Sequence, residues 1–168
     1  VKRCQWFLDD TFVVMSGDAL TDVDLTSLVQ EHKRKGALAT IAVKEVDEVE
    51  QFGVVVSESD GRITSFQEKP RREEALSNQV NTGIYIFEPE IFEYIPPGQF
   101  YDFGKQVFPH LVKIRAPFYA AVINDYWCDV GSIDTYRQAH ADILQGKVRV
   151  PAAGILKRTD KASVLIGD

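Results

Sequence analysis

The chain has 168 residues, of which 45% are hydrophobic and 26% charged, and its formal net charge is −6 at pH 7. These values are typical of one soluble globular domain and exclude collagen-like and disordered chains. The acidic balance argues against a nucleic-acid partner, because phosphate backbones are bound by clustered Lys and Arg. No apolar run reaches the length of about 20 residues that a membrane span needs, so a membrane is not an expected partner either.

The cysteines and the N-terminus indicate a cytoplasmic protein. Cys4 and Cys128 lie far apart and show no CxxC spacing, so neither a zinc site nor a disulfide framework is expected. The first residues lack the apolar stretch of a signal peptide. They also lack an initiator Met, which favours a fragment of a longer protein.

The first quarter of the chain has the pattern of an α/β fold. Residues 2–8 resemble the end of a helix, and the apolar run 12–16 predicts a strand. Apolar residues then recur at helical spacing between Asp24, a suitable N-cap, and Gly36, a suitable helix end. The next apolar run, 39–43, completes a strand–helix–strand unit. A Rossmann-like mixed sheet is therefore expected.

The hydrophobic period changes to two after this unit. Residues 52–57 and 63–68 flank the turn Asp60-Gly61, which predicts a β-hairpin. The later predicted elements are strands over 81–87, 118–123 and 126–129, short helices over 89–94 and 103–112, and a longer helix that begins after Ser132 and ends at Gly146.

The last residues differ from the rest of the chain. Short aliphatic pieces alternate with Pro151, Gly154 and Gly167. We expect residues 1–147 to form one body, and residues 148–168 to be a linker or the first coil of a β-solenoid, the start of a left-handed β-helix.

Two carboxylates follow apolar strands. Asp18 follows the predicted strand 12–16 after Gly17, and Asp129 follows an aromatic run and precedes Gly131. In open α/β sheets ligands bind outside the carboxyl ends of the strands, and Mg²⁺ prefers oxygen ligands, commonly one or two carboxylates with substrate phosphates. The two side chains could therefore hold one Mg²⁺, although Asp18 could instead cap its own turn with Thr21 and Asp22.

The end of the predicted hairpin carries a second group of polar residues. Glu68 offers two acceptor oxygens for neighbouring sugar hydroxyls, and Lys69 offers a compact cation for a phosphate. Pro70 stops the strand and fixes where both side chains point. The alternative is an ordinary surface ion pair beside Arg71 and Arg72, which would contribute little free energy.

Asn81 and Gly83 open the following strand. The Asn81 amide could bind sugar hydroxyls, and Gly83 would let a ligand approach the backbone closely. Asn81 could instead satisfy its own turn. The three histidines form no nucleophilic or metal-binding cluster. His32 falls in the basic segment 32–35, which is expected to be the solvated last turn of a helix.

These residues belong to five short motifs that occur in order along residues 1–147. Together the motifs resemble those of the sugar-1-phosphate nucleotidylyltransferases, most closely the mannose-1-phosphate guanylyltransferase branch. The resemblance implies the C-terminal portion of a nucleotide-diphospho-sugar transferase fold. The motifs are Ser16-Gly17-Asp18, Phe66-Gln67-Glu68-Lys69-Pro70, Asn81-Thr82-Gly83-Ile84-Tyr85, Asp102-Phe103-Gly104 and Tyr126-Trp127-Cys128-Asp129-Val130-Gly131-Ser132.

The resemblance also implies a reaction and its residues. A sugar-1-phosphate oxygen would attack the α-phosphorus of a nucleoside triphosphate, GTP in the favoured branch, and release pyrophosphate. Asp18, Lys69 and Asp129 would be the catalytic residues, and Asp18 and Asp129 would hold Mg²⁺. The substrate-binding residues would be Gly17, Glu68, Lys69, Asn81 and Gly83.

The family's glycine-rich nucleotide-binding loop does not occur in residues 1–168. The isolated chain is therefore expected to have weak or no activity, and an uncovered sheet edge would favour self-association, for example as a homo-oligomer. Two other functions stay open. One is a non-catalytic regulatory homologue that binds a nucleotide sugar within a larger complex. The other is a glycosyltransferase that uses Asp22-Val23-Asp24, although this segment suits helix capping better.

Overall fold

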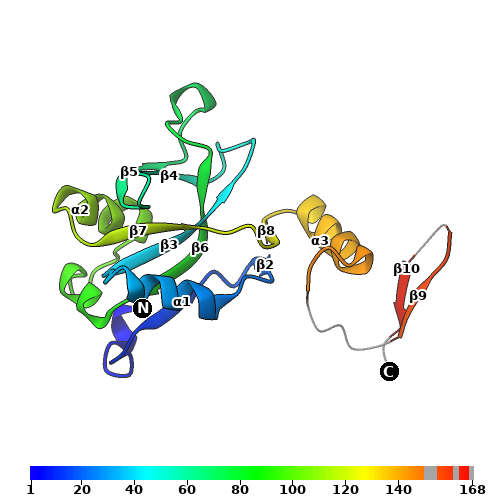
Figure 1. Ribbon diagram of the computed structural model, residues 1–168, viewed down its shortest axis with the longest axis horizontal. Coiled ribbons are helices and arrows are strands. Elements are labelled where there is room, and N and C mark those ends of the chain that lie inside the picture. The colour runs from blue at the N-terminus through cyan, green and yellow to red at the C-terminus, as the bar shows by residue number, and fades with distance from the viewer. Residues whose placement is uncertain (150–154, 161–162, 167–168) are drawn as a thin grey trace. The chain divides into compact units, whose positions relative to one another are not determined.

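The computed structural model describes residues 1–149, 155–160 and 163–166 (Figure 1). The described residues fall into two compact units. The first unit consists of residues 1–16 and 25–124, and the second consists of residues 17–24 together with the chain from Asp125 onward. No helix in the described ranges is long and apolar enough to cross a membrane.

The first unit is built on a mixed six-stranded sheet in the order β5-β4-β6-β3-β7, with β1 paired to β6. β3 and β7 run parallel, whereas the other paired strands of this sheet run antiparallel. The predicted mixed α/β architecture and the predicted hairpin are confirmed. The strands are β1 (Phe12–Met15), β3 (Ala39–Glu45), β4 (Gly53–Ser57), β5 (Ile63–Glu68), β6 (Gln79–Phe87) and β7 (Phe118–Val122).

The predicted strand–helix–strand unit is present, but its two strands are not neighbours. β6 lies between β1 and β3 and pairs antiparallel with both, so that Phe87 is opposite Phe12 on one side and Ala39 on the other. The connecting helix α1 (Leu25–Arg34) lies against β3, β6 and β7 (Figure 1). The inserted strand comes from much later in the sequence, so local periodicity could not indicate it.

Aromatic side chains form the centre of the core. Phe108 stacks on Phe103 and on Phe118, with ring centroids 5.7 and 5.3 Å apart, and Phe87 stacks on Phe103 at 5.2 Å. This packing fixes β6 and the segment around residue 103, both of which contribute to the site described below. The remaining helical elements of the unit are η1 (Lys2–Cys4), η2 (Arg72–Glu74), η3 (Pro89–Tyr94), the π-helical turn η4 (Phe103–Val107) and α2 (Phe108–Lys113).

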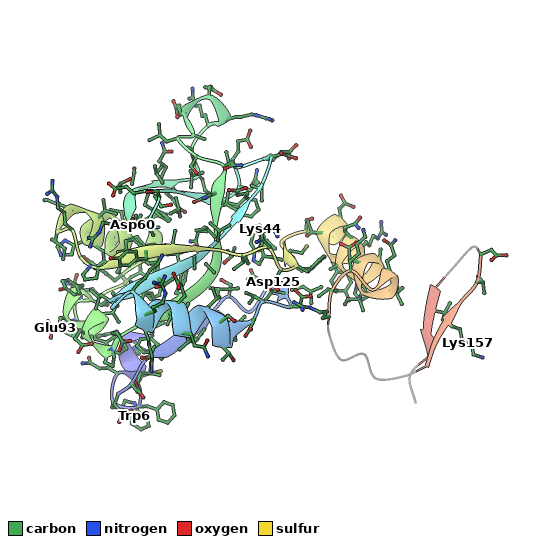
Figure 2. The ribbon with its side chains drawn as sticks, viewed as in Figure 1. Trp6, Lys44, Asp60, Glu93, Asp125 and Lys157 are labelled. Carbon is green, nitrogen blue, oxygen red and sulfur yellow. The ribbon has the colours of Figure 1, made fainter. Side chains whose placement is uncertain are left out.

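Three sequence predictions need correction in this unit. Residues 2–8 contain only the single turn η1, beyond which Trp6 points into solvent and is 84% exposed (Figure 2). The helix expected over 103–112 is two elements, because Pro109 has no backbone N–H to continue a regular ladder from η4. His32 is fully buried rather than solvated, with Nδ1 2.7 Å from Thr40 Oγ1 and Nε2 3.1 Å from Glu88 Oε1.

The second unit contains the short antiparallel ribbon of β2 (Ala19–Thr21) and β8 (Trp127–Asp129), followed by α3 (Ile133–Gln145). α3 begins and ends where predicted: Ser132 Oγ accepts the Thr135 N–H at 3.1 Å, and Gly146 ends the helix at a φ of 73°. Ala139 of this helix is buried, whereas Ile133 is 73% exposed.

Downstream of α3, β9 (Ile155–Arg158) and β10 (Ser163–Ile166) form an antiparallel pair. Pro151, Gly154 and Gly167, on which the expectation of a β-solenoid depended, lie outside the described residues. The boundary at residue 147 and the β-solenoid stay predictions.

Candidate functional site

A cavity of about 320 Å³ opens in the first unit beside β1, β5, β6 and η4. It brings together Glu68 and Asn81, two of the predicted substrate-binding residues, with the Ser16 and Asp102 motifs. The full lining is Val14, Met15, Ser16, Glu68, Asn81, Tyr85, Asp102, Phe103 and Gly104.

Two carboxylates share one side of this cavity. A Cβ atom at Gly104 would lie 2.8 Å from Glu68 Oε2 and 3.4 Å from Asp102 Oδ1, so the missing side chain makes room for both groups. Asp102 is held in place at the start of η4, where Oδ1 accepts the Lys105 N–H at 2.9 Å. Its own N–H donates to Gln106 Oε1 at 2.7 Å. The cavity therefore presents several fixed acceptors, which suit ligand hydroxyl groups.

Asn81 and Tyr85 form the opposing polar wall. Asn81 Oδ1 accepts the Gly83 N–H at 2.9 Å, and Nδ2 donates to the Tyr85 hydroxyl at 3.0 Å. Asn81 thus makes a local hydrogen bond within β6 rather than in a turn that opens the strand, and it still has one N–H left for a ligand. Burial, with the nearby Asp102 and Glu68 carboxylates, raises the pKa of Tyr85, so its hydroxyl stays protonated and can donate.

Gly83 brings the end of β1 against β6. Its φ is 76°, and a side chain at this position would collide with the side chain of Ser16. The Ser16 N–H also donates to the Gly83 carbonyl oxygen at 2.9 Å. The close approach expected at Gly83 is therefore made by Ser16, which in turn lines the cavity.

Lys69 lies beyond the cavity lining and is exposed. Its φ is 47°, a left-handed conformation that is uncommon for a residue with a side chain, and its N–H donates to the Phe52 carbonyl oxygen at 3.1 Å. Within the described ranges, no ion pair joins Glu68 or Lys69 to Arg71 or Arg72. The surface ion-pair interpretation of this motif is thus not supported.

Asp18 and Asp129 lie together in the second unit. The β2–β8 ribbon places Ala19 opposite Asp129, and the Val130 N–H donates to the Asp18 carbonyl oxygen at 2.8 Å. Asp18 is exposed and Asp129 is half-buried. Gly17 is also exposed, and no atom lies within 4 Å of the place that a Cβ would occupy.

The donor chemistry of the ribbon fits a hard divalent cation. Asp18 and Asp129 supply carboxylate oxygens, and among the described residues no group of three or more His, Cys, Asp or Glu side chains could form an all-protein metal cage. Two carboxylates are the usual protein share of a Mg²⁺ site that substrate phosphates complete. Burial raises the pKa of the neighbouring Cys128 thiol.

The sequence did not assign a role to Ser16, Tyr85, Asp102 or Phe103, although all four belong to the quoted motifs. The Asp102-Phe103-Gly104 motif was the available signal, because an N-capping carboxylate beside a glycine marks a tight approach to another element. Tyr85 forms part of the cavity wall.

Comparison with known proteins agrees with these motifs. The profile described as Nucleotidyl transferase matches residues 1–146. A UTP–glucose-1-phosphate uridylyltransferase of Synechocystis sp. is 52% identical over 145 residues, which are 85% of this chain and 37% of that protein. A glucose-1-phosphate adenylyltransferase of Desulfitobacterium hafniense is 35% identical over 141 residues, covering 79% of this chain and 35% of that protein.

The fold has a counterpart among solved structures. The structure of a UDP-glucose pyrophosphorylase complexed with UDP-glucose matches with a TM-score of 0.72 at 24% identity, over 86% of this chain and 60% of that one. The chain thus spans little more than a third of the two sequence relatives. Their names contain glucose-1-phosphate, so they support the predicted family and not its mannose-1-phosphate branch. Because the family profile covers nearly all of the first 147 residues, this chain belongs to the nucleotidyl transferase family.

Proposed function

We propose that the full-length protein containing this chain transfers a nucleotidyl group from a nucleoside triphosphate to a sugar-1-phosphate. The observation that carries this proposal is the cavity in which Glu68, Asn81, Tyr85 and Asp102 converge. Glucose-1-phosphate and UTP are the first substrates to consider, because the uridylyltransferase relative is 52% identical. Mannose-1-phosphate with GTP, the pair favoured by the motif resemblance, is the alternative within the same reaction class.

The cavity binds the sugar. Glu68 and Asp102 accept hydrogen bonds from hydroxyl groups, while the free N–H of Asn81 and the Tyr85 hydroxyl donate. Gly83 contributes by admitting Ser16 to the cavity wall. This mixture of acceptors and donors suits a polyhydroxylated ring better than an apolar ligand.

Residues at the ends of the strands bind the phosphate groups of the substrates. Lys69 supplies a cation for the sugar phosphate, and its left-handed backbone conformation sets the direction in which the chain leaves β5. Gly17 leaves the backbone next to Asp18 open to a ligand. Asp18 and Asp129 hold a divalent cation, Mg²⁺, which when bound neutralises charge on the phosphate oxygens.

The reaction is a direct displacement. A sugar-1-phosphate oxygen forms a bond to the α-phosphorus, and the bond from that phosphorus to the bridging oxygen breaks, so the electron pair leaves with pyrophosphate. No side chain forms a covalent intermediate. The contribution of Glu68, Asn81 and Lys69 is to orient the acceptor and to balance its charge.

Pyrophosphate release by the full-length protein tests the proposal. UTP, GTP, ATP and dTTP are each paired with glucose-1-phosphate and with mannose-1-phosphate in the presence of Mg²⁺. Turnover with one pair, lost in Asp129→Asn, is the expected result. No turnover with any pair, from a folded protein that still binds a nucleotide sugar, would overturn the proposal in favour of a regulatory homologue.

Light scattering of residues 1–168 separately tests the predicted self-association.

A further inference from the structure

The ribbon that carries Asp18 and Asp129 is too short to be stable by itself. β2 and β8 have three residues each, and an isolated two-stranded pair is marginal in water even when longer. The position of both carboxylates must therefore be fixed by contacts beyond the strand pairing.

Tyr126, the residue before β8, makes several of these contacts. Its N–H donates to Asp22 Oδ1 at 2.8 Å, and its carbonyl oxygen accepts the Thr21 hydroxyl at 2.7 Å, so both backbone polar groups are tied to the end of β2. Its side-chain hydroxyl donates to Asp142 Oδ2 at 2.8 Å. This last bond joins the ribbon to α3.

Asp142 is a buried carboxylate, and both of its oxygens accept hydrogen bonds from neighbouring side chains. It is 7% exposed, and Oδ1 accepts hydrogen bonds from Gln138 Nε2 and Lys147 Nζ, both at 2.8 Å. The Lys147 hydrogen bond lowers the pKa of Asp142. An ionised, oriented acceptor on a capped helix is a rigid attachment point for the Tyr126 hydroxyl.

Arg149 contacts the same end of the ribbon as Tyr126. Its N–H and Nε both donate to Asp22 Oδ2, at 2.9 and 3.1 Å, and Nη2 donates to Asp125 Oδ1 at 2.7 Å. Asp125, labelled in Figure 2, precedes Tyr126 in the chain. Asp22 thus accepts hydrogen bonds from both Tyr126 and Arg149, and these bonds hold the end of β2 next to the start of β8.

We propose that Tyr126 and Asp142 are positioning residues that set the divalent-cation affinity of Asp18 and Asp129. The proposal rests on the metal role assigned above to those two carboxylates. Loss of the Tyr126–Asp142 bond frees the ribbon from α3, so the two carboxylates spend less time at the spacing that one cation requires. Outer hydrogen bonds that orient metal ligands are typically worth about 10- to 100-fold in affinity.

The test is a titration of the full-length protein with Mn²⁺ alone, followed by the EPR signal of the free ion. Tyr126→Phe removes only the hydroxyl and is expected to weaken Mn²⁺ binding about tenfold, the lower end of that range. Asp142→Asn retains an acceptor oxygen and is expected to cause a smaller loss. The matched control is Tyr136→Phe. Tyr136 lies on α3, as Asp142 does, and is 56% exposed, so loss of its hydroxyl should leave Mn²⁺ binding unchanged.

Thermal unfolding by circular dichroism tests whether each variant is folded at the titration temperature. If Tyr126→Phe is unfolded there, the Mn²⁺ affinity of Asp142→Asn tests the proposal instead. A purely structural role would lower the unfolding temperature and leave Mn²⁺ affinity unchanged, which would overturn the proposal. Equal weakening in Tyr136→Phe would also overturn it. If the unsubstituted protein binds no Mn²⁺, or Asp129→Asn binds it equally well, the metal assignment itself fails. If binding is lost in Asp129→Asn and normal in Tyr126→Phe, only the positioning role fails.

Discussion

Gly104 provides a test of the cavity that does not remove any polar group. In Gly104→Ala the new methyl carbon would lie 2.8 Å from Glu68 Oε2, closer than such atoms approach one another. The carboxylate is the far end of a flexible side chain, so it swings away and the fold adjusts. We therefore expect the unfolding free energy to change by less than about 1 kcal/mol, with the better helix propensity of alanine opposing the crowding.

The effect on sugar binding is expected to be larger than the effect on stability. A hydrogen bond to a charged group contributes about 1.5–3 kcal/mol, and each 1.4 kcal/mol corresponds to about a factor of ten. Displacement of Glu68 should therefore raise the KM for the sugar-1-phosphate about 10- to 100-fold. The KM for the nucleoside triphosphate should stay the same, because no nucleotide role is assigned to Glu68.

Steady-state pyrophosphate release by the full-length protein measures both KM values. A double-mutant cycle supplies the control: since the methyl group acts by moving Glu68, Gly104→Ala should have no further effect in a Glu68→Ala background. A folded Gly104→Ala protein with an unchanged sugar-phosphate KM would refute the reasoning, as would full additivity in the cycle.

Three further predictions concern stability. Burial lowers the pKa of His32 below its ordinary value of 6.5. As the pH falls below 6.5, the unfolded chain therefore binds more protons than the folded one, and the urea midpoint should decrease from pH 8 to pH 6. His32→Gln cannot titrate and should flatten this slope. Ser132→Ala removes the N-cap of α3 and should cost about 1 kcal/mol in thermal unfolding; no measurable change would contradict the capping role. Phe108→Ala removes a fully buried ring and should cost about 3–5 kcal/mol in urea unfolding, whereas a loss below 1 kcal/mol would show that the aromatic core is misassigned.

Elements with local signals could be predicted from the sequence. The hairpin of β4 and β5 follows from alternation around Asp60-Gly61, and α3 follows from its cap at Ser132 and its left-handed end at Gly146. The neighbours of each strand could not be predicted in the same way. The insertion of β6 between β1 and β3 depends on pairing between residues 34 to 75 positions apart in the sequence, about which hydrophobic periodicity carries no information.

The candidate site shows the same division. Glu68 and Asn81 were identified because their side chains can hydrogen-bond sugar hydroxyls and because they belong to motifs that resemble those of the family. The contribution of Asp102 became visible only with the geometry of Gly104, since two carboxylates 34 residues apart meet there. The bracing of the β2–β8 ribbon by Tyr126 and Asp142 depends on tertiary hydrogen bonds and left no recognisable pattern in the sequence.

The most direct measurement of the central claim is the steady-state kinetics of nucleotide-sugar formation by the full-length protein and its Glu68→Gln variant, with UTP and glucose-1-phosphate as substrates. The cavity's role as the sugar site predicts that Glu68→Gln raises the KM for glucose-1-phosphate about tenfold or more and leaves the KM for UTP unchanged. Equal KM values for glucose-1-phosphate in the two proteins, or a change confined to UTP, would contradict the assignment of this cavity to the sugar.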